Sequence, residues 1–119
     1  MKYMIMMFSG MGETLRDRSP EWISGMHEFM IGLDTELRES GELVDSRKLI
    51  DPTAATTVRF VDAKAVPTDG PYAEVKESLA GYWIIEATEE RALEVAGRVV
   101  EHIEFPMEVR QVMDERPEM

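Results

Sequence analysis

Proton transfer in this chain would depend on its carboxylates and on a histidine, and Asp69 and His27 are the first candidates. Asp69 lies in the run 68–77, TDGPYAEVKE, where a loop could present its carboxylate at a cleft as a base or a ligand anchor. The alternative is structural, because Asp-Gly-Pro also builds a tight turn. His27 suits proton transfer near neutral pH with a carboxylate such as Asp69, or it is a half-buried histidine beside an apolar helix face.

Further polar residues of the same run favour a binding role for it. Tyr72, Glu74 and Lys76 can donate, accept and form ion pairs, and a turn alone requires none of them. Trp83 either fills the core or forms a wall of the same pocket. The sequence therefore predicts catalytic roles for Asp69 and His27, and substrate-binding roles for Tyr72, Glu74, Lys76 and Trp83.

Other kinds of site lack a matching pattern. His102, with Glu101 and Glu104 nearby, shows no recognised metal-ligand spacing. It lies near the C-terminal end of the second predicted helix, where the helix dipole favours a positively charged side chain. The chain has no cysteine, which excludes disulfides, thiolate metal sites and cysteine nucleophiles. No nucleotide fingerprint or Ser-His-Asp spacing is present. We therefore predict neither a metal nor a cofactor.

Length and charge narrow the class of protein and its partners. The 119 residues suit one domain, and 44% hydrophobic with 31% charged residues is a globular composition. A net charge of −11 would repel phosphate backbones and anionic membranes, so nucleic acid and membrane are not expected partners. The apolar run 3–8 is too short for a signal-peptide core or a membrane span. Together with the absence of cysteine, this predicts a cytoplasmic protein.

The elements that would position these residues follow from periodicity and from capping signals. Ser19-Pro20-Glu21 is typical of a helix start, and Gly41 suits a left-handed residue after the helix end. The apolar face of this helix consists of Trp22, Met26, Phe29, Leu33 and Leu37. A second helix opens at Thr88. We predict a loop at 10–18, strands at 2–8, 43–49, 56–61, 65–66, 81–87 and 107–113, and a helical turn at 73–78.

The order of these elements predicts a fold class. Without the central hairpin it reads strand, helix, strand, strand, helix, strand, which is the ferredoxin-like α+β arrangement with both helices on one face of an antiparallel sheet. The strands at 3–8 and 82–85 are apolar on both faces, so the other sheet face would expose a large apolar surface. We expect a second copy to cover it, which gives a dimeric α+β barrel. The domain would comprise residues 1–113, followed by a polar tail at 114–119.

The run 68–77 resembles the DGPF family, a branch of the YCII-related proteins, in which it reads close to T-D-G-P-F-A-E-T-K-E. Leu79, Gly81, Tyr82 and Trp83 follow in the family's order, and the segments 1–4, 36–41 and 55–59 add support. The resemblance covers residues 1–113. Tyr72 and Val75 depart from the usual Phe and Thr, and the stretch 101–105 replaces the usual residues before the last strand.

The resemblance implies a dimeric α+β barrel and leaves two functional classes open. YCII-like proteins carry a His/Asp pair suspected of acid–base chemistry in a cleft, which implies an enzyme of lyase or hydrolase type acting on a small, partly apolar molecule. DGPF genes often neighbour those of extracytoplasmic-function sigma factors, which implies instead a non-enzymatic regulatory or protein-interaction module with a sigma factor as partner. A concave pocket at Asp69 would favour the first class, and an exposed loop on a flat surface the second.

Overall fold

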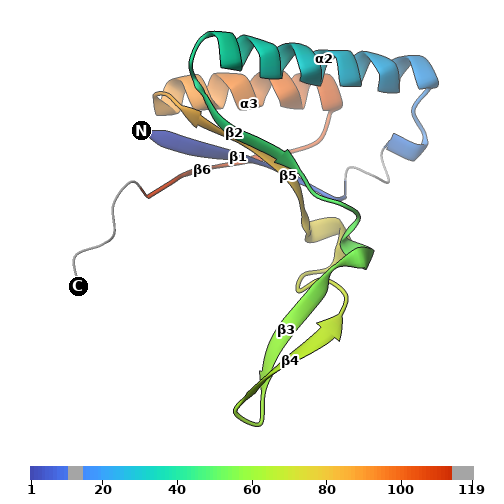
Figure 1. Ribbon diagram of the computed structural model, residues 1–119. Helices are drawn as coiled ribbons and strands as arrows, with labels where there is room; N and C mark the ends of the chain where they lie inside the picture. The colour runs from blue at the N-terminus through green and yellow to red at the C-terminus, as the bar shows by residue number, and fades with distance from the viewer. Residues whose placement is uncertain (11–14, 114–119) are drawn as a thin grey trace.

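The computed structural model describes residues 1–10 and 15–113. Its body is a four-stranded antiparallel sheet with helices packed on one face, and a two-stranded hairpin projects away from the helices on the other side (Figure 1). In chain order the elements are β1 (Lys2–Phe8), α2 (Pro20–Glu39), β2 (Leu43–Lys48), η1 (Pro52–Ala54), β3 (Thr56–Val61), β4 (Lys64–Asp69), η2 (Val75–Glu77), β5 (Leu79–Glu86), α3 (Glu89–Ile103) and β6 (Glu108–Gln111).

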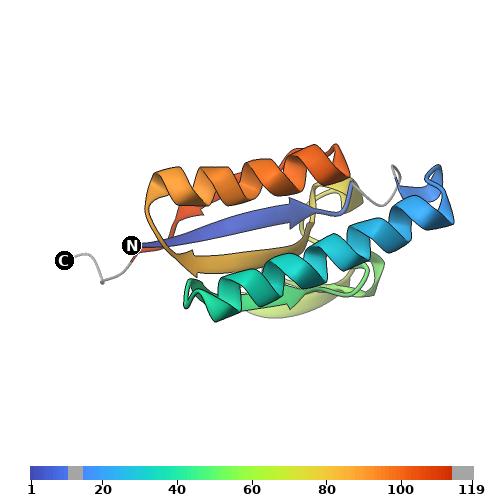
Figure 2. The ribbon, with the colours of Figure 1, turned by 90° about the horizontal axis from the view of Figure 1, so that it is seen from above.

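The sheet has the strand order β2-β5-β1-β6, and every neighbouring pair is antiparallel. Helices α2 and α3 lie side by side over it (Figure 2). The hairpin β3–β4 forms a separate two-stranded sheet and is inserted between β2 and β5. This confirms the ferredoxin-like α+β fold with an inserted hairpin that the sequence predicts.

Helix α2 begins and ends where its capping residues predict. The Ser19 hydroxyl accepts a hydrogen bond from the backbone N–H of Trp22, which satisfies one of the free donors of the first turn. At the other end Gly41 has φ +81°, and the N–H groups of Gly41 and Glu42 donate to the carbonyls of Arg38 and Leu37. This is a Schellman motif, for which glycine is favoured because a side chain would be strained at that φ.

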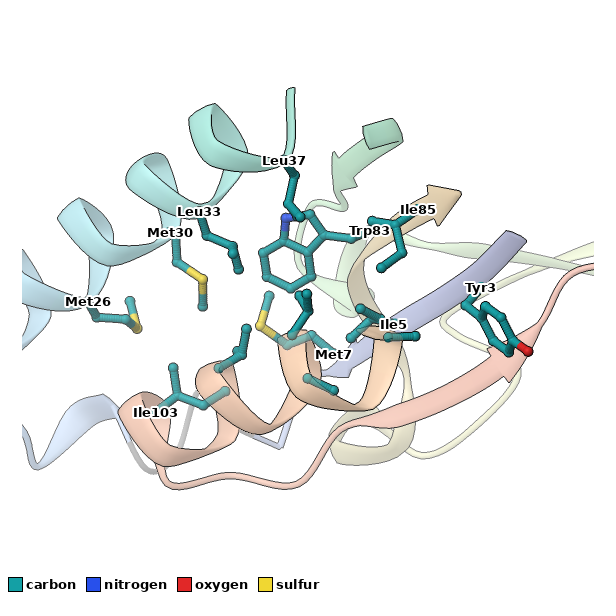
Figure 3. Packing of buried hydrophobic residues seen from close by; sticks show 14 residues of the cluster. Tyr3, Ile5, Met7, Met26, Met30, Leu33, Leu37, Trp83, Ile85 and Ile103 are labelled. Carbon is teal, nitrogen blue, oxygen red and sulfur yellow. The ribbon is translucent and has the colours of Figure 1, made fainter. Parts of the chain in front are cut away.

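The core lies between the helices and one face of the sheet (Figure 3). Strand β1 alternates strictly between buried and half-buried residues, so Tyr3, Ile5 and Met7 point toward the helices while Met4 and Met6 point to the opposite face. The helices contribute Met26, Met30, Leu33, Leu37, Ala92, Val95, Ala96, Val99 and Ile103.

Three sequence predictions differ from the structure or lie outside the described residues. The loop expected at 10–18 contains helical residues at Leu15 and Arg16, and residues 11–14 lie outside the described part. The short strand expected at 65–66 extends over Lys64–Asp69, because the cross-strand pairing continues to Thr56. The tail at 114–119 also lies outside the described residues. Among the described helices, none combines the length and apolar character that crossing a bilayer requires.

Candidate functional site

The hairpin β3–β4, which we call the arm, is held at its root by hydrogen bonds around the Asp-Gly-Pro segment. The N–H of Gly70 donates to the carbonyl of Ala55 at 2.8 Å, and the Thr57 hydroxyl donates to the carbonyl of Gly70 at 2.7 Å. Gly70 has φ +105°, where a larger residue would be strained. The chain therefore turns sharply at Gly70 and leads directly into the loop that carries Tyr72.

A groove of about 700 Å³ opens at the root of the arm, where the arm meets the end of β1 and the start of β5. Most of its lining is apolar, and it also contains two carboxylates, Asp51 and Glu77. The large apolar side chains that line the groove are Phe8, Leu49, Ile50, Val58, Tyr72 and Leu79. The groove thus combines apolar walls with a small number of hydrogen-bonding groups.

Of the residues that the sequence predicts for substrate binding, Tyr72 lies at this groove. Its side chain is 87% exposed, so the ring stands at the rim and is free to pack on a bound molecule. A phenol provides both an apolar face and a hydroxyl that can donate or accept. Tyr72 can therefore contact either part of a partly apolar ligand.

Asp69 lies at the margin of the groove. It is the last residue of β4 and pairs with Thr56 across the arm, so the two side chains share one face of the hairpin. Thr56 and Val58 of that face line the groove, whereas Asp69 does not. The Asp69 carboxylate is exposed to solvent. It therefore lies beside the groove, at the side where the arm begins.

The two carboxylates in the groove were not identified from the sequence. Asp51 caps the short helix η1, and its carboxylate accepts hydrogen bonds from the Thr53 N–H at 2.9 Å and the Thr53 hydroxyl at 2.7 Å. These bonds, the backbone one foremost, lower the pKa of Asp51, so it stays ionised near neutral pH. Two sequence signals could have pointed to these carboxylates. One is the capping pattern Asp51-Pro52-Thr53, and the other is the position of Glu77 at the end of the run 68–77.

Glu74 and Lys76 line a different depression beneath the same loop. This depression has a volume of about 540 Å³ and also contains Ser9 and Arg16, and it shares Asp51 with the groove. The N–H of Gly10 donates to the carbonyl of Lys76 at 2.9 Å, which fixes the loop against the end of β1. The structure therefore places these two residues beside the groove and separates them from Tyr72.

Trp83 lies in the core and not in the wall of the groove. Its side chain is 3% exposed and packs on the helix side of the sheet, as Figure 3 shows. The indole N–H donates to the Asp34 carboxylate at 2.5 Å. The sequence leaves open whether Trp83 fills the core or forms a wall of the pocket. In the structure it fills the core, and its indole N–H is hydrogen-bonded.

His27 lies apart from the groove. It is exposed on α2, in the helix layer, whereas the arm and its root are on the opposite side of the sheet (Figure 1). The fold of the chain therefore does not bring His27 together with Asp69. His102 stacks on Phe29 with ring centroids 4.4 Å apart. Within residues 1–10 and 15–113, no three His, Asp or Glu side chains gather as a metal site would require.

The face of the sheet away from the helices, which we call the open face, is apolar along its centre. Met4 and Met6 of β1 pair with Ile84 and Tyr82 of β5, and all four side chains are only half-buried. Ion pairs flank this stripe on both outer strands, Asp45–Arg47 on β2 and Glu108–Arg110 on β6.

Tyr82 adds a polar contact to the open face. Its hydroxyl donates to the Asp45 carboxylate at 3.0 Å, and this bond is the main cause that raises the pKa of the phenol. The phenol therefore stays protonated and bridges β5 to β2, between the apolar centre and the charged edge.

These features define a ferredoxin-like α+β domain with an inserted hairpin arm and a groove beside its TDGP loop. The chain belongs to the YCII-related domain family, whose model matches residues 1–114. A relative from Rhizobium meliloti (strain 1021), the "Uncharacterized protein R00369", is 39% identical over 59 residues. That match spans 49% of this chain and 48% of the relative, so it covers about half the length of each. The resemblance that the sequence indicates is thus confirmed at the level of the YCII-related family.

Proposed function

We propose that the protein is a homodimer that binds a small, partly apolar molecule in the groove at the root of the arm. The observation that carries this proposal is the groove itself, with its apolar walls, two carboxylates and an exposed tyrosine at the TDGP loop. Its volume of about 700 Å³ falls within the range of roughly 300–1,000 Å³ typical of small-molecule sites.

The side chains at the groove suggest how the ligand would be held. The apolar walls would take its hydrocarbon part, and Tyr72 would pack over it at the rim. The carboxylates of Asp51 and Glu77 would accept hydrogen bonds from a hydroxyl or amino group, because an ionised carboxylate only accepts. A neutral or cationic ligand would therefore be favoured over an anion.

Acid–base chemistry of lyase or hydrolase type would use Asp69 as the base at the margin of the groove. An exposed carboxylate is a weak base, so a bound ligand would have to desolvate it for efficient proton transfer. His27 of the same protomer lies in the helix layer. We therefore propose Asp69 alone as the base, in place of a His27–Asp69 pair within one protomer.

The open face of the sheet supports the homodimer. An apolar centre surrounded by charged residues is the usual anatomy of a protein interface. Each flank carries one positive and one negative side chain, so a copy rotated about a two-fold axis can place opposite charges together. Without such a partner the stripe of Met4, Met6, Ile84 and Tyr82 would remain in contact with water.

Thermal-shift screening of a metabolite library tests the proposed ligand site on wild type, Tyr72→Ala, Asp69→Asn and the control Asp62→Asn. The control Asp62→Asn makes the same chemical change at the far turn of the arm. The φ of +49° at this position is one that Asn adopts readily. Compounds that raise the Tm of wild type and Asp62→Asn should raise that of Tyr72→Ala less. If Asp69 anchors the ligand, Asp69→Asn should also lose part of the shift. Equal shifts in all four proteins would refute binding at this groove.

A non-enzymatic regulatory module with a sigma factor as partner is the second candidate. The observation in its favour is that Tyr72 and Asp69 are both exposed, as a loop that contacts another protein would be. Calorimetric titration with a purified extracytoplasmic-function sigma factor distinguishes the two candidates. Binding that Tyr72→Ala weakens, with no library compound shifting the Tm, would favour the regulatory module.

A further inference from the structure

One face of the arm is apolar and exposed beyond its polar root pair, Thr56 and Asp69. The arm pairs Val58 with Pro67 and Phe60 with Ala65, and directly opposite residues share a face, so these four side chains form one surface. Phe60 is 82% exposed and Val58 is 65% exposed. We call this surface the arm face. Because Val58 also lines the groove, the arm face and the groove are continuous.

The arm has little to stabilise it within its own protomer. A two-stranded hairpin by itself is marginally stable in water, and here the hairpin forms a sheet of its own that projects away from the body (Figure 1). All four side chains of the arm face are exposed to solvent. A run of exposed apolar side chains of this kind usually marks an interaction surface. A second surface is therefore needed to cover the arm face.

The direction and length of the arm indicate which surface covers it. The arm projects on the side of the sheet that carries the open face, and seen from above it lies beneath the sheet (Figures 1 and 2). Its strands have six residues each, so the arm reaches about 20 Å, whereas two packed sheets lie only about 10 Å apart. If two open faces pack together, each arm is longer than the distance between the two sheets. It must therefore pass the edge of the other subunit's sheet and lie against that subunit.

The charge of the arm agrees with docking on a second copy. Arg59 and Lys64 balance Asp62 and Asp69, so the arm is neutral, although the whole chain carries a net charge of −11. An arm without net charge can approach an acidic subunit without long-range repulsion. The turn at Asp62 and Ala63 uses two residues with positive φ, which fixes the strand register and keeps Val58 and Phe60 on one face.

We propose that each arm clasps the other subunit of the homodimer, with the arm face packed against it, and that this contact completes the groove. The proposal rests on the proposed dimer and adds a second contact region to it. Since Val58 belongs to both surfaces, docking of the arm would fix one wall of the groove. A ligand would then bind more tightly to the dimer than to a single subunit.

Sedimentation velocity of wild type, Phe60→Asp and Val61→Asp tests the clasp. Val61 is the matched control, because it is the next residue, is exposed, and points to the opposite side of the arm. Phe60→Asp should raise the dimer dissociation constant at least tenfold, and Val61→Asp should leave it within twofold of wild type. Circular dichroism should show all three proteins folded, since Phe60 makes no contribution to the core.

A nitroxide label attached to Ala65→Cys gives a second measurement that does not depend on a destabilising charge. The chain has no cysteine, so this residue alone would be labelled. The label should be immobile in the dimer and become mobile on dilution to monomer.

The outcomes separate the two proposals. A wild type that sediments as a monomer at micromolar concentration refutes the dimer, and the clasp with it. A stable dimer with a mobile label and an unchanged dissociation constant in Phe60→Asp refutes the clasp alone. Binding of the arm to another protein, with the dimer unaffected, would likewise overturn it.

Discussion

Among single side chains, the bond between Trp83 and Asp34 links the sheet to α2 across the core. The indole N–H is buried and donates to the Asp34 carboxylate. Asp34→Leu would leave this donor without a partner, which typically costs about 1–3 kcal/mol. We expect a corresponding loss in the free energy of unfolding, measured by urea denaturation. Asp34→Asn retains an acceptor oxygen and should lose less than half as much. Equal losses in both variants would show that the hydrogen bond is not the cause.

The ion pair of Glu42 with Arg91 should make stability depend on pH at the acid end. The guanidinium holds both carboxylate oxygens, at 2.9 and 3.0 Å, and joins the turn after α2 to α3. This bond and a second one from Ser40 lower the pKa of Glu42 below its ordinary value. The ionised form is favoured in the folded state, so the contribution is present above the ordinary glutamate pKa of about 4.3 and is lost as the pH falls through and below it.

Glu42→Gln should therefore reduce stability at pH 7 by about 1 kcal/mol, and the difference from wild type should shrink toward pH 3. Urea denaturation at several pH values measures this. Glu39→Gln, at an exposed position of α2, serves as the control and should have little effect at any pH. A difference that stays constant from pH 7 to pH 3 would contradict the linkage.

At the scale of elements, the close approach of β2 to β5 depends on Gly81. A Cβ atom at this position would lie 2.9 Å from the carbonyl oxygen of Arg47, which is backbone and cannot move without shifting the strand. We expect Gly81→Ala to destabilise the protein by about 1–3 kcal/mol in urea denaturation. Gly97→Ala is the matched control, because a Cβ there meets nothing within 4 Å.

In the interior of α3 the Gly97→Ala change should be neutral or stabilising by up to about 1 kcal/mol, since alanine favours helix. Hydrogen exchange would locate the effect of Gly81→Ala, because the backbone amides of β2 should lose protection if this strand is displaced. A variant with wild-type stability and unchanged protection would show that β2 can shift at no cost.

Local signals in the sequence were sufficient to predict most of the elements. The bounds of α2 follow from Ser19 and Gly41, whose side chain and backbone conformation satisfy the helix ends directly. The position of Trp83 could not be predicted in the same way. Trp83 and Ile84 are neighbours on a strand that is apolar on both faces, and periodicity alone does not say which face the helices cover.

The candidate site was predicted only in part, for a related reason. The run 68–77 drew attention to Tyr72, because it is continuous in sequence and its turn residues are distinctive. The structure places Tyr72 at the groove. The groove, however, forms where Phe8, Asp51 and Glu77 meet from three separate segments. Such a meeting depends on the tertiary fold and has no signal in any one segment. The distance between His27 and the arm is likewise set by the sheet that separates them.

For the whole molecule, the open face and the arm face are two exposed apolar surfaces on the same side of one chain. A protein that gains stability by pairing them must unfold at a temperature that depends on its concentration, because mass action favours the dimer. The effect on the Tm is about 5 °C for a hundredfold change in concentration, given the unfolding entropy expected for two chains of 119 residues.

We therefore expect the Tm of the wild type to rise by about this amount between 1 and 100 µM in calorimetry or fluorimetry. Met6→Glu would place a charge at the centre of the open face, opposite Glu108, and should abolish the concentration dependence. The matched control is Ile31→Glu, the same kind of change on the exposed surface of α2, where the side chain is 67% exposed. It should behave as wild type. A Tm that does not change with concentration in the wild type, or one that still rises in Met6→Glu, would show that the open face is not where two copies meet.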